Sequence, residues 1–193
     1  PILPKIFIFK SMKKLKIFYP SKTISFHVTT IILILLTSTF FIIYELTKFF
    51  PNEKENLDAF LILTGILTMI YWLFYAINNH FRHEYAKGHF EGFLIIENDK
   101  IICNKEIYLI NEIEKISILH WYFRGKFNGN ISAISAKKEN GLKNYIEITT
   151  KNKTDKYYFL QTQKENIKMF KDEIRTYYRF GKLNEQNYKN IVE

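Results

Sequence analysis

Two stretches decide the fold of this chain: ISFHVTTIILILLTSTFFIIY at residues 24–44 and AFLILTGILTMIYWLFYAI at residues 59–77. Neither contains Asp, Glu, Lys or Arg, and each is close to the ~20 residues that a helix needs to cross about 30 Å of hydrocarbon. A spanning segment must satisfy its own backbone polar groups, which favours a helix. The pattern predicts a transmembrane helical hairpin at residues 24–79. The alternative is a buried hairpin of a soluble protein, whose helices usually carry a polar stripe.

The charges around the hairpin predict its orientation. Six lysines and no acidic residue precede the first span, acidic residues outnumber lysines between the spans, and basic residues return after the second. Cytoplasmic flanks collect Lys and Arg, so we expect a multi-pass protein of the bacterial inner membrane with both termini in the cytoplasm. Residues 1–23 are expected to be a basic cytoplasmic segment and residues 80–89 a juxtamembrane junction. The residues expected at the membrane surface are Lys13, Lys14, Lys16, Arg82 and Lys87.

Small residues inside the spans predict close helix packing. Hydroxyl side chains recur in the first span, and Thr64, Gly65 and Thr68 form a patch in the second. Such patches let helices approach closely, so we expect the spans to pack on each other or on neighbouring copies in a homo-oligomer. Cys103 is the single cysteine, which excludes an internal disulfide and suits a cytoplasmic domain.

The pattern changes to that of a small β domain after the hairpin. Short apolar runs and alternating residues predict strands, separated by a polar, glycine-bearing loop at residues 124–143. The predicted strands are residues 90–97, 100–105, 107–110, 113–122, 144–150 and 156–161. We place the domain at residues 90–183 and a tail at residues 184–193.

The last predicted element of the domain is a helix. Thr162 and Glu165 form a capping box at its start, and Gly181 is suited to end it. A basic stripe lies beside its apolar face, which we interpret as a solvated surface; the alternative is a lipid-facing surface. The stripe consists of Lys164, Lys168, Lys171, Arg175 and Arg179.

The region at residues 88–183 resembles the bacterial pleckstrin-homology-like (PH-like) domains of two-span membrane proteins, many of them from Bacteroidetes. The resemblance rests on residues 91–94, 107–118, 122–125, 140–144 and 177–182. It implies a membrane hairpin plus a small α+β cytoplasmic domain, with a PH-like antiparallel β-barrel or sandwich closed by a C-terminal helix. It also implies binding or scaffolding. The architecture is similar, too, to two-span β-barrel effectors of cyclic-nucleotide antiphage defence.

Catalytic and metal-binding motifs are missing from the sequence. It contains no phosphate-binding loop, nucleophile elbow, HExxH or paired-cysteine pattern. The spacing of His80 and His83, with His27 on the first span, could suggest a metal or haem site, but interfacial side chains explain it better. We therefore expect no enzyme activity, no metal and no cofactor.

The function that the sequence favours most is a membrane-anchored recognition or scaffold module. Its partners would be the lipid bilayer and a lipid headgroup, a protein or an anionic small molecule. The alternative is a defence effector whose barrel senses a cyclic oligonucleotide and whose spans oligomerise to disrupt the membrane. The excess of basic residues is too small to favour nucleic acid. The candidate ligand-binding residues are Trp121, Tyr122, Arg124, Lys126, Lys137, Lys138, Lys143 and Asn144.

Overall fold

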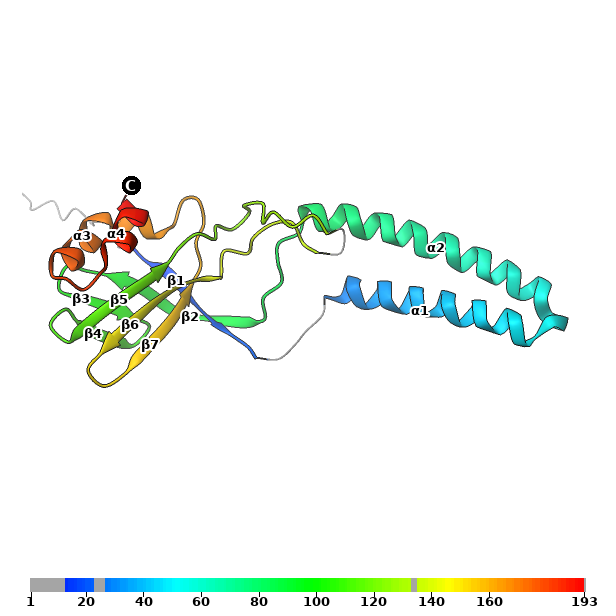
Figure 1. Ribbon diagram of the computed structural model, residues 1–193, viewed down its shortest axis with the longest axis horizontal. Coiled ribbons are helices and arrows are strands. Elements are labelled where there is room, and N and C mark those ends of the chain that lie inside the picture. Colours follow the sequence, from blue (N-terminus) through cyan, green and yellow to red (C-terminus); the bar gives the residue numbers. More distant parts are fainter. Residues whose placement is uncertain (1–12, 23–26, 133–134, 193) are drawn as a thin grey trace, which may run out of the picture. The chain divides into compact units, whose positions relative to one another are not determined.

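The computed structural model describes residues 13–22, 27–132 and 135–192. The chain divides into two compact units. The hairpin unit contains residues 21–87 and 125–140, and the sheet domain contains residues 1–20, 88–124 and 141–193. The chain therefore passes between the units four times (Figure 1).

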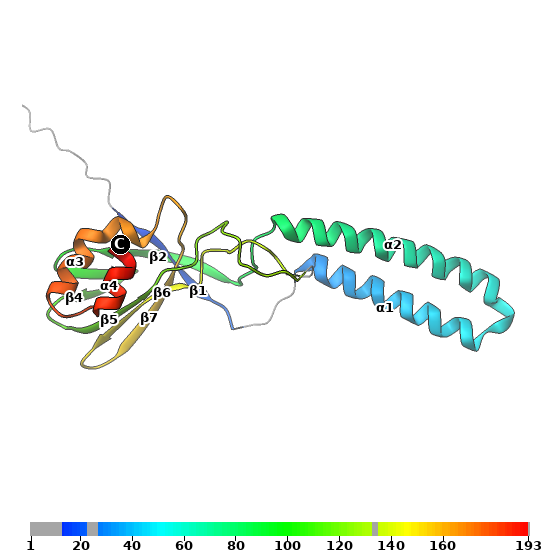
Figure 2. The ribbon, with the colours of Figure 1, turned by 45° about the horizontal axis from the view of Figure 1, so that its top comes forward.

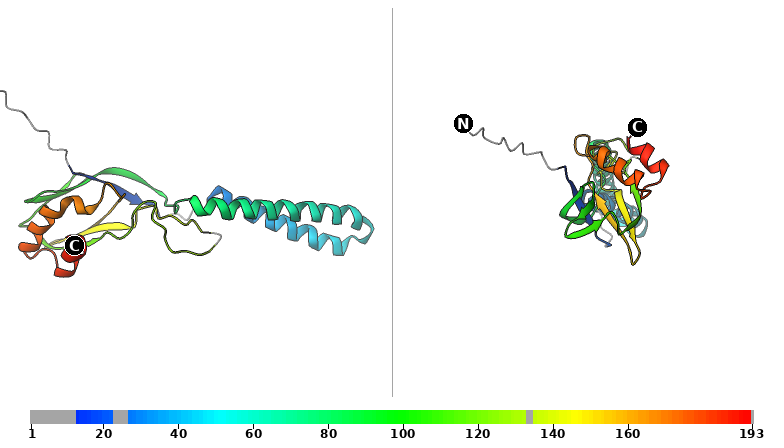
Figure 3. Two further views of the ribbon diagram at one scale, coloured as in Figure 1. Left: turned by 90° about the horizontal axis from the view of Figure 1, so that it is seen from above. Right: turned by 90° about the vertical axis from the view of Figure 1, so that its left-hand side faces the viewer.

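Two long helices lie side by side in the hairpin unit (Figure 1; Figure 3, left). Helix α1 is Val28–Phe49 and α2 is Lys54–Phe81, with a 3-10 turn, η1, at Pro51–Glu53 between them. Both helices are long and apolar enough to cross a membrane. No residue of α1 is buried, and only Tyr75 and Asn79 of α2 are. An apolar helix pair without a buried face is what a lipid environment tolerates.

Gly65 brings the two helices into close contact. A Cβ atom at this position would lie 3.2 Å from the ring of Phe40 on α1, so the glycine makes room for that ring. The small-residue patch predicted in the second span therefore faces the first span at this point. Contact with neighbouring copies stays a prediction.

The sheet domain contains a seven-stranded antiparallel sheet in the order β4-β3-β2-β1-β7-β6-β5. Its strands are β1 Leu15–Pro20, β2 Gly88–Ile96, β3 Lys100–Cys103, β4 Glu106–Leu109, β5 Ile113–Leu119, β6 Asn144–Thr150 and β7 Thr154–Phe159. Apart from β1, each strand lies within or close to a predicted range. Among the described strands, β4 and β5 are the two edges and do not pair with each other. The sheet is therefore open: of the expected barrel or sandwich, the described strands do not form a closed barrel.

Strand β1 is the main difference from the sequence-based domain boundaries. It lies in the stretch interpreted as a basic cytoplasmic flank, yet it is the central strand and pairs with both β2 and β7. Leu15 and Ile17 are almost completely buried, whereas Lys16 between them is exposed. Lys16, one of the lysines that suggested a membrane flank, thus lies on the outer side of an alternating strand.

Helices cover the inner face of the sheet, as Figure 2 shows for α3 and α4. A 3-10 turn, η2 at Ile167–Phe170, leads into α3 at Lys171–Arg179, and α4 follows at Glu185–Val192. Phe170, Tyr177 and Ile191 are buried in one core with strand residues such as Ile146 and Phe159. The predicted tail at residues 184–193 is therefore part of the packed domain up to Val192, the last described residue.

The ends of the predicted helix are partly as expected. The Glu165 amide donates to Thr162 Oγ1 at 2.9 Å, but helical structure begins only after Asn166, whose side chain accepts from the Lys168 amide. At the other end, Gly181 has a φ of 71° and the Lys182 amide donates to the Tyr177 carbonyl at 2.9 Å. The predicted glycine stop is confirmed.

The segment after Gly181 covers the β5 edge of the sheet. The Ile116 amide donates to the Lys182 carbonyl and the Ile118 amide to Asn187 Oδ1, both at 2.7 Å. A side-chain amide thus takes the place that a neighbouring strand would have. This protects the edge from pairing with other chains.

Candidate functional site

The predicted ligand-binding residues are divided between the two units. Trp121, Tyr122, Arg124, Lys143 and Asn144 belong to the sheet domain. Lys126, Lys137 and Lys138 belong to the hairpin unit.

The Asn144 side chain connects the segment after β5 to the segment before β6. It is completely buried, and its side-chain Nδ2 donates to the Tyr122 and Gly141 carbonyls at 2.6 and 2.8 Å. Its Oδ1 accepts from the Tyr122 amide at 3.0 Å. These bonds fasten the chain where it leaves β5 to the chain where it enters β6. A ligand-binding role for Asn144 is therefore not supported by its geometry.

Lys137 is also part of the structural framework. It is only 8% exposed, and its Nζ donates to the carbonyls of Asn130 and Ser132. Its ammonium group thus stabilises the loop from inside. Lys138 lies over the Phe81 ring at 5.8 Å.

Residues 125–140, which we call the junction loop, pack against the end of α2. The Lys137 amide donates to the Asn79 carbonyl at 3.0 Å, and the Lys138 amide donates to the Arg82 carbonyl at 3.1 Å. The Glu84 amide donates back to the Lys138 carbonyl at 2.7 Å. Because these bonds join main chain to main chain, they do not depend on side-chain rotamers. The loop that the sequence pattern suggested to be polar surface is anchored to the hairpin.

Side-chain hydrogen bonds join α1 and α2 next to this anchor. Thr30 Oγ1 lies 2.9 Å from Tyr75 Oη, and Tyr71 Oη donates to the Thr29 carbonyl at 3.1 Å. Arg82 Nη1 donates to Thr29 Oγ1 at 2.8 Å. The hydroxyls of Tyr71 and Tyr75 thus connect the two helices. Such bonds between apolar helices fix their register.

The second candidate feature is the outer sheet face, meaning the side of the sheet opposite α3 and α4. Antiparallel sheets usually present polar residues on an uncovered face, but this face carries large apolar side chains. Phe90, Ile107 and Leu109 are between 46% and 58% exposed. The large side chains of this face are Phe90, Phe93, Ile107, Leu109, Tyr145 and Tyr158. Several large apolar side chains exposed on one sheet face make this face a candidate interaction site.

Strand pairing arranges the aromatic members in a row across the sheet. Tyr145 pairs with Tyr158, Tyr158 with Phe18, and Phe18 with Phe90. Paired residues in an antiparallel sheet point to the same side. The row thus crosses β6, β7, β1 and β2. Pairing of β1 with β7 creates it, which is why the sequence pattern did not show it.

Four exposed lysines accompany these rings. Lys14 lies 4.4 Å from the centre of the Phe93 ring, Lys156 lies 3.6 Å from that of Tyr145, and Lys143 lies 5.3 Å from that of Tyr122. Lys16 pairs with Phe93 across β1 and β2. These four residues, Lys14, Lys16, Lys143 and Lys156, are called the outer-face lysines. Each combines an exposed ammonium group with an aromatic or apolar neighbour.

The other predicted surface lysine, Lys13, has a different role. It points to the inner side of the sheet, where its Nζ forms an ion pair with Glu173 Oε1 at 2.9 Å. Alternation along β1 thus divides the basic N-terminal stretch. Lys13 supports the helix layer, whereas Lys14 and Lys16 remain available on the surface.

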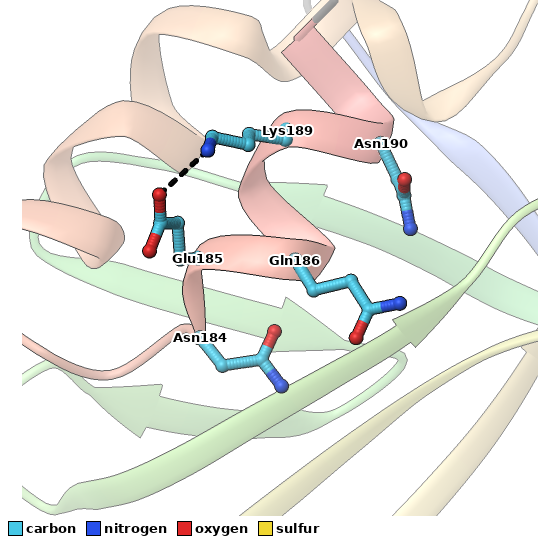
Figure 4. A pocket seen from close by; sticks show the side chains of 5 residues that line it. All are labelled: Asn184, Glu185, Gln186, Lys189 and Asn190. Carbon is cyan, nitrogen blue, oxygen red and sulfur yellow. Dashed lines mark ion pairs between the residues drawn. The ribbon is translucent and has the colours of Figure 1, made fainter.

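A shallow depression lies beside α4 (Figure 4). It has a volume of about 570 Å³ and is lined by Asn184, Glu185, Gln186, Lys189 and Asn190. Lys189 and Glu185 neutralise each other in an ion pair of 2.7 Å. The lining is polar and open, without a convergent set of charged groups, so it is a weak candidate for a ligand site.

Buried His120 contacts the same helix. Its Nε2 donates to the Asn190 carbonyl at 3.0 Å, its ring stacks on Trp121, and its Nδ1 has no hydrogen-bond partner among the described residues. Burial lowers the pKa of His120, the Asn190 carbonyl partly opposes this, and nearby Lys168 adds to the lowering. Burial therefore disfavours the protonated form of His120 in the folded state.

The described residues contain no group of three His, Cys, Asp or Glu side chains placed to hold a metal ion. Cys103 is buried, and burial raises the pKa of its thiol far above the ordinary value, which suits a packing role. Comparisons of the chain with protein-family models, with curated proteins and with solved structures found no match.

Proposed function

We propose that this protein is a membrane-anchored recognition module. In this proposal, α1 and α2 cross the bacterial inner membrane with both termini in the cytoplasm, and the sheet domain is a PH-like domain that binds an anionic partner without catalysis. The length and apolar surface of the two helices support the anchor. The distribution of charge around them supports the orientation.

The observation that carries the proposal is the anchoring of the junction loop. Its ends leave and re-enter the sheet domain at Arg124 and Gly141, both of which hydrogen-bond to the main chain of Gln161 at 2.9 and 3.0 Å. Near its end, the amides of Lys137 and Lys138 donate to the carbonyls of Asn79 in α2 and of Arg82 just after α2. The junction loop is therefore fastened to the hairpin, and the residues that flank it are fastened within the sheet domain.

Reporter fusions test the anchor and the orientation. Green fluorescent protein fused after residue 193 should fluoresce, and alkaline phosphatase inserted at Asn52, between the helices, should be active outside the cytoplasm. The reverse pattern, or extraction of the protein by salt without detergent, would contradict the proposal. The effector alternative predicts depolarised cells on expression, whereas a recognition module should leave the membrane potential unchanged.

Hydrogen exchange tests the anchoring of the junction loop to the hairpin. In detergent or vesicles the amides of Lys137 and Lys138 should exchange slowly, because they donate to the carbonyls of Asn79 in α2 and of Arg82 just after it. Replacing Asn128 by Ala removes side-chain bonds to Glu84 and to the Ala136 carbonyl and should speed exchange of both amides. Replacing exposed Lys126 by Ala is the matched control. Fast exchange of both amides in the unmodified protein would refute the anchoring of the junction loop.

A further inference from the structure

We infer that the outer sheet face docks onto the anionic surface of the membrane in which the hairpin is anchored. The inference rests on the proposed function and specifies its partner. The face combines large exposed apolar side chains with the outer-face lysines. This is the composition by which proteins bind at the boundary of an anionic leaflet, where rings enter the interface and ammonium groups meet phosphates.

The shape of the face favours a surface over a small molecule. Its aromatic row extends across four neighbouring strands. Phe90 is exposed, Tyr145 and Tyr158 are half-buried, and Phe18 between them is buried beneath the surface of the row. With strands about 4.8 Å apart, the row is roughly 14 Å long. Ligands of small size are usually held in concave pockets, whereas an extended row of rings on a sheet suits an extended partner.

The length of the connecting chain makes the membrane a reachable partner. Residues 21–27 separate β1 from α1, and residues 82–87 separate α2 from β2. At ~3.5 Å per residue, neither connection can extend beyond about 28 Å. Phe18 and Phe90 lie within two residues of the strand ends at which these connections begin. One end of the row is thus close along the chain to both connections.

Charge argues against a second copy as the occupant. In a symmetric pair, the same patch meets itself, so the outer-face lysines of one copy would meet those of the other. The acidic residues on this face are fewer, and Glu97 is already paired with Lys100 at 3.4 Å. Glu147 lies opposite Lys156 in the β6–β7 pairing. The excess positive charge therefore fits an anionic partner better than another copy of the chain.

Depth-dependent quenching in vesicles tests the inference with the full chain. In a Cys103→Ala background, a fluorophore at Ile107→Cys reports on the outer sheet face, and one at exposed Gln163→Cys reports on the helix side. Vesicles of phosphatidylcholine, with or without phosphatidylglycerol, carry a nitroxide on a fraction of their headgroups. Docking predicts strong quenching at position 107 with the anionic lipid and weak quenching at position 163 in both.

Two lysine pairs provide matched variants. Replacing Lys16 and Lys156 by Gln removes charge from the outer sheet face, and replacing Lys164 and Lys168 by Gln removes the same charge from the helix side. Each outer-face lysine should contribute about a fivefold change in the ratio of docked to undocked domain. The first pair should reduce docking by about 25-fold together, whereas the second should change it little. Circular dichroism verifies that both variants remain folded.

Three outcomes would overturn the inference. These are equal quenching at position 107 in neutral and anionic vesicles, equal effects of the two lysine pairs, and burial of position 107 in detergent accompanied by a dimeric mass. The last result would identify a second copy as the partner. Flotation with neutral vesicles separates this inference from the proposed function, because the anchor alone should retain the protein there. Failure to float would refute the anchor.

Discussion

The Tyr108 hydroxyl donates a hydrogen bond of 2.6 Å to Asp155 Oδ2, although their strands, β4 and β7, are not neighbours in the sheet. Tyr157 Oη lies 2.6 Å from the same hydroxyl. Because Tyr108 gives its proton to the carboxylate, Tyr157 acts as the donor in this second bond. This side-chain network joins two strands of the sheet that no backbone ladder connects.

Removing the Tyr108 hydroxyl should weaken the sheet domain. Tyr108→Phe keeps the ring in the core but leaves Asp155 with one hydrogen bond fewer, which should lower the free energy of unfolding by about 1–3 kcal/mol. Tyr145→Phe, on the outer sheet face, is the matched control and should change it by less than about 0.5 kcal/mol. Denaturant unfolding of the full chain in detergent, followed by near-ultraviolet circular dichroism, measures both. Equal stability of the two variants would show that the network contributes nothing.

The Asp155 carboxylate should make stability depend on acidic pH. Burial opposes its ionisation, but hydrogen bonds from Lys153 and Tyr108 outweigh burial and hold the pKa of Asp155 below its ordinary value of 3.8. A depressed pKa contributes stability above the unfolded value that is lost as the pH falls through the folded value. The melting temperature should therefore decrease below about pH 4, and less steeply in Asp155→Asn, which already lacks the ionised carboxylate. Parallel melting curves for both proteins would contradict this.

His120 should produce a separate effect at mildly acidic pH. Its pKa lies below the ordinary value of 6.5 because burial disfavours the charged ring, so the unfolded chain takes up a proton that the folded domain excludes. Stability then decreases as the pH falls from about 6.5 towards the folded pKa. His120→Gln cannot be protonated and retains an amide donor for the Asn190 carbonyl, so it should remove this step. Melting temperatures between pH 7 and pH 5 would show it, and an unchanged step in the variant would exclude His120 as the cause.

Asn144→Asp should destabilise the domain more than its small change in size suggests. The substitution keeps an acceptor for the Tyr122 amide but loses both donors and places a carboxylate beside the Tyr122 and Gly141 carbonyls. We expect a loss of about 3–5 kcal/mol, because an uncompensated buried charge is costly. Thermal melting of the full chain, with exposed Asn130→Asp in the junction loop as control, measures the difference. Comparable melting of the two variants would mean that Asn144 does not fasten the loop ends.

Local patterns predicted much of the fold. Turn residues at positions 98 and 99, together with alternation in residues 113–122, located strands close to where the structure has them. Gly181 ends α3 as predicted because a positive φ at this position is nearly free of cost for glycine. These features depend on neighbours within a few residues, so the sequence displays them directly.

The candidate site depended on contacts that the sequence does not display. Lys137 and Lys143 look equivalent in a polar loop, yet one ammonium group is enclosed by carbonyls and the other lies on an exposed ring. The outer sheet face requires β1 to lie between β2 and β7, which are more than fifty residues apart along the chain. Alternation could have indicated which residues of β1 share a side. It could not indicate which side the helices would cover.

The sequence by itself determined the two membrane-length helices, the asymmetry of charge around them and most of the local strand and turn structure, because hydrophobic length, charge and turn chemistry are properties of contiguous residues. Only the tertiary structure decided that the N-terminal basic stretch supplies the central strand, that the junction loop is anchored to α2, and that an aromatic and basic face is left uncovered. The physical reason is that pairing of distant strands and burial of one sheet face are collective choices, stabilised by contacts among residues far apart in the chain.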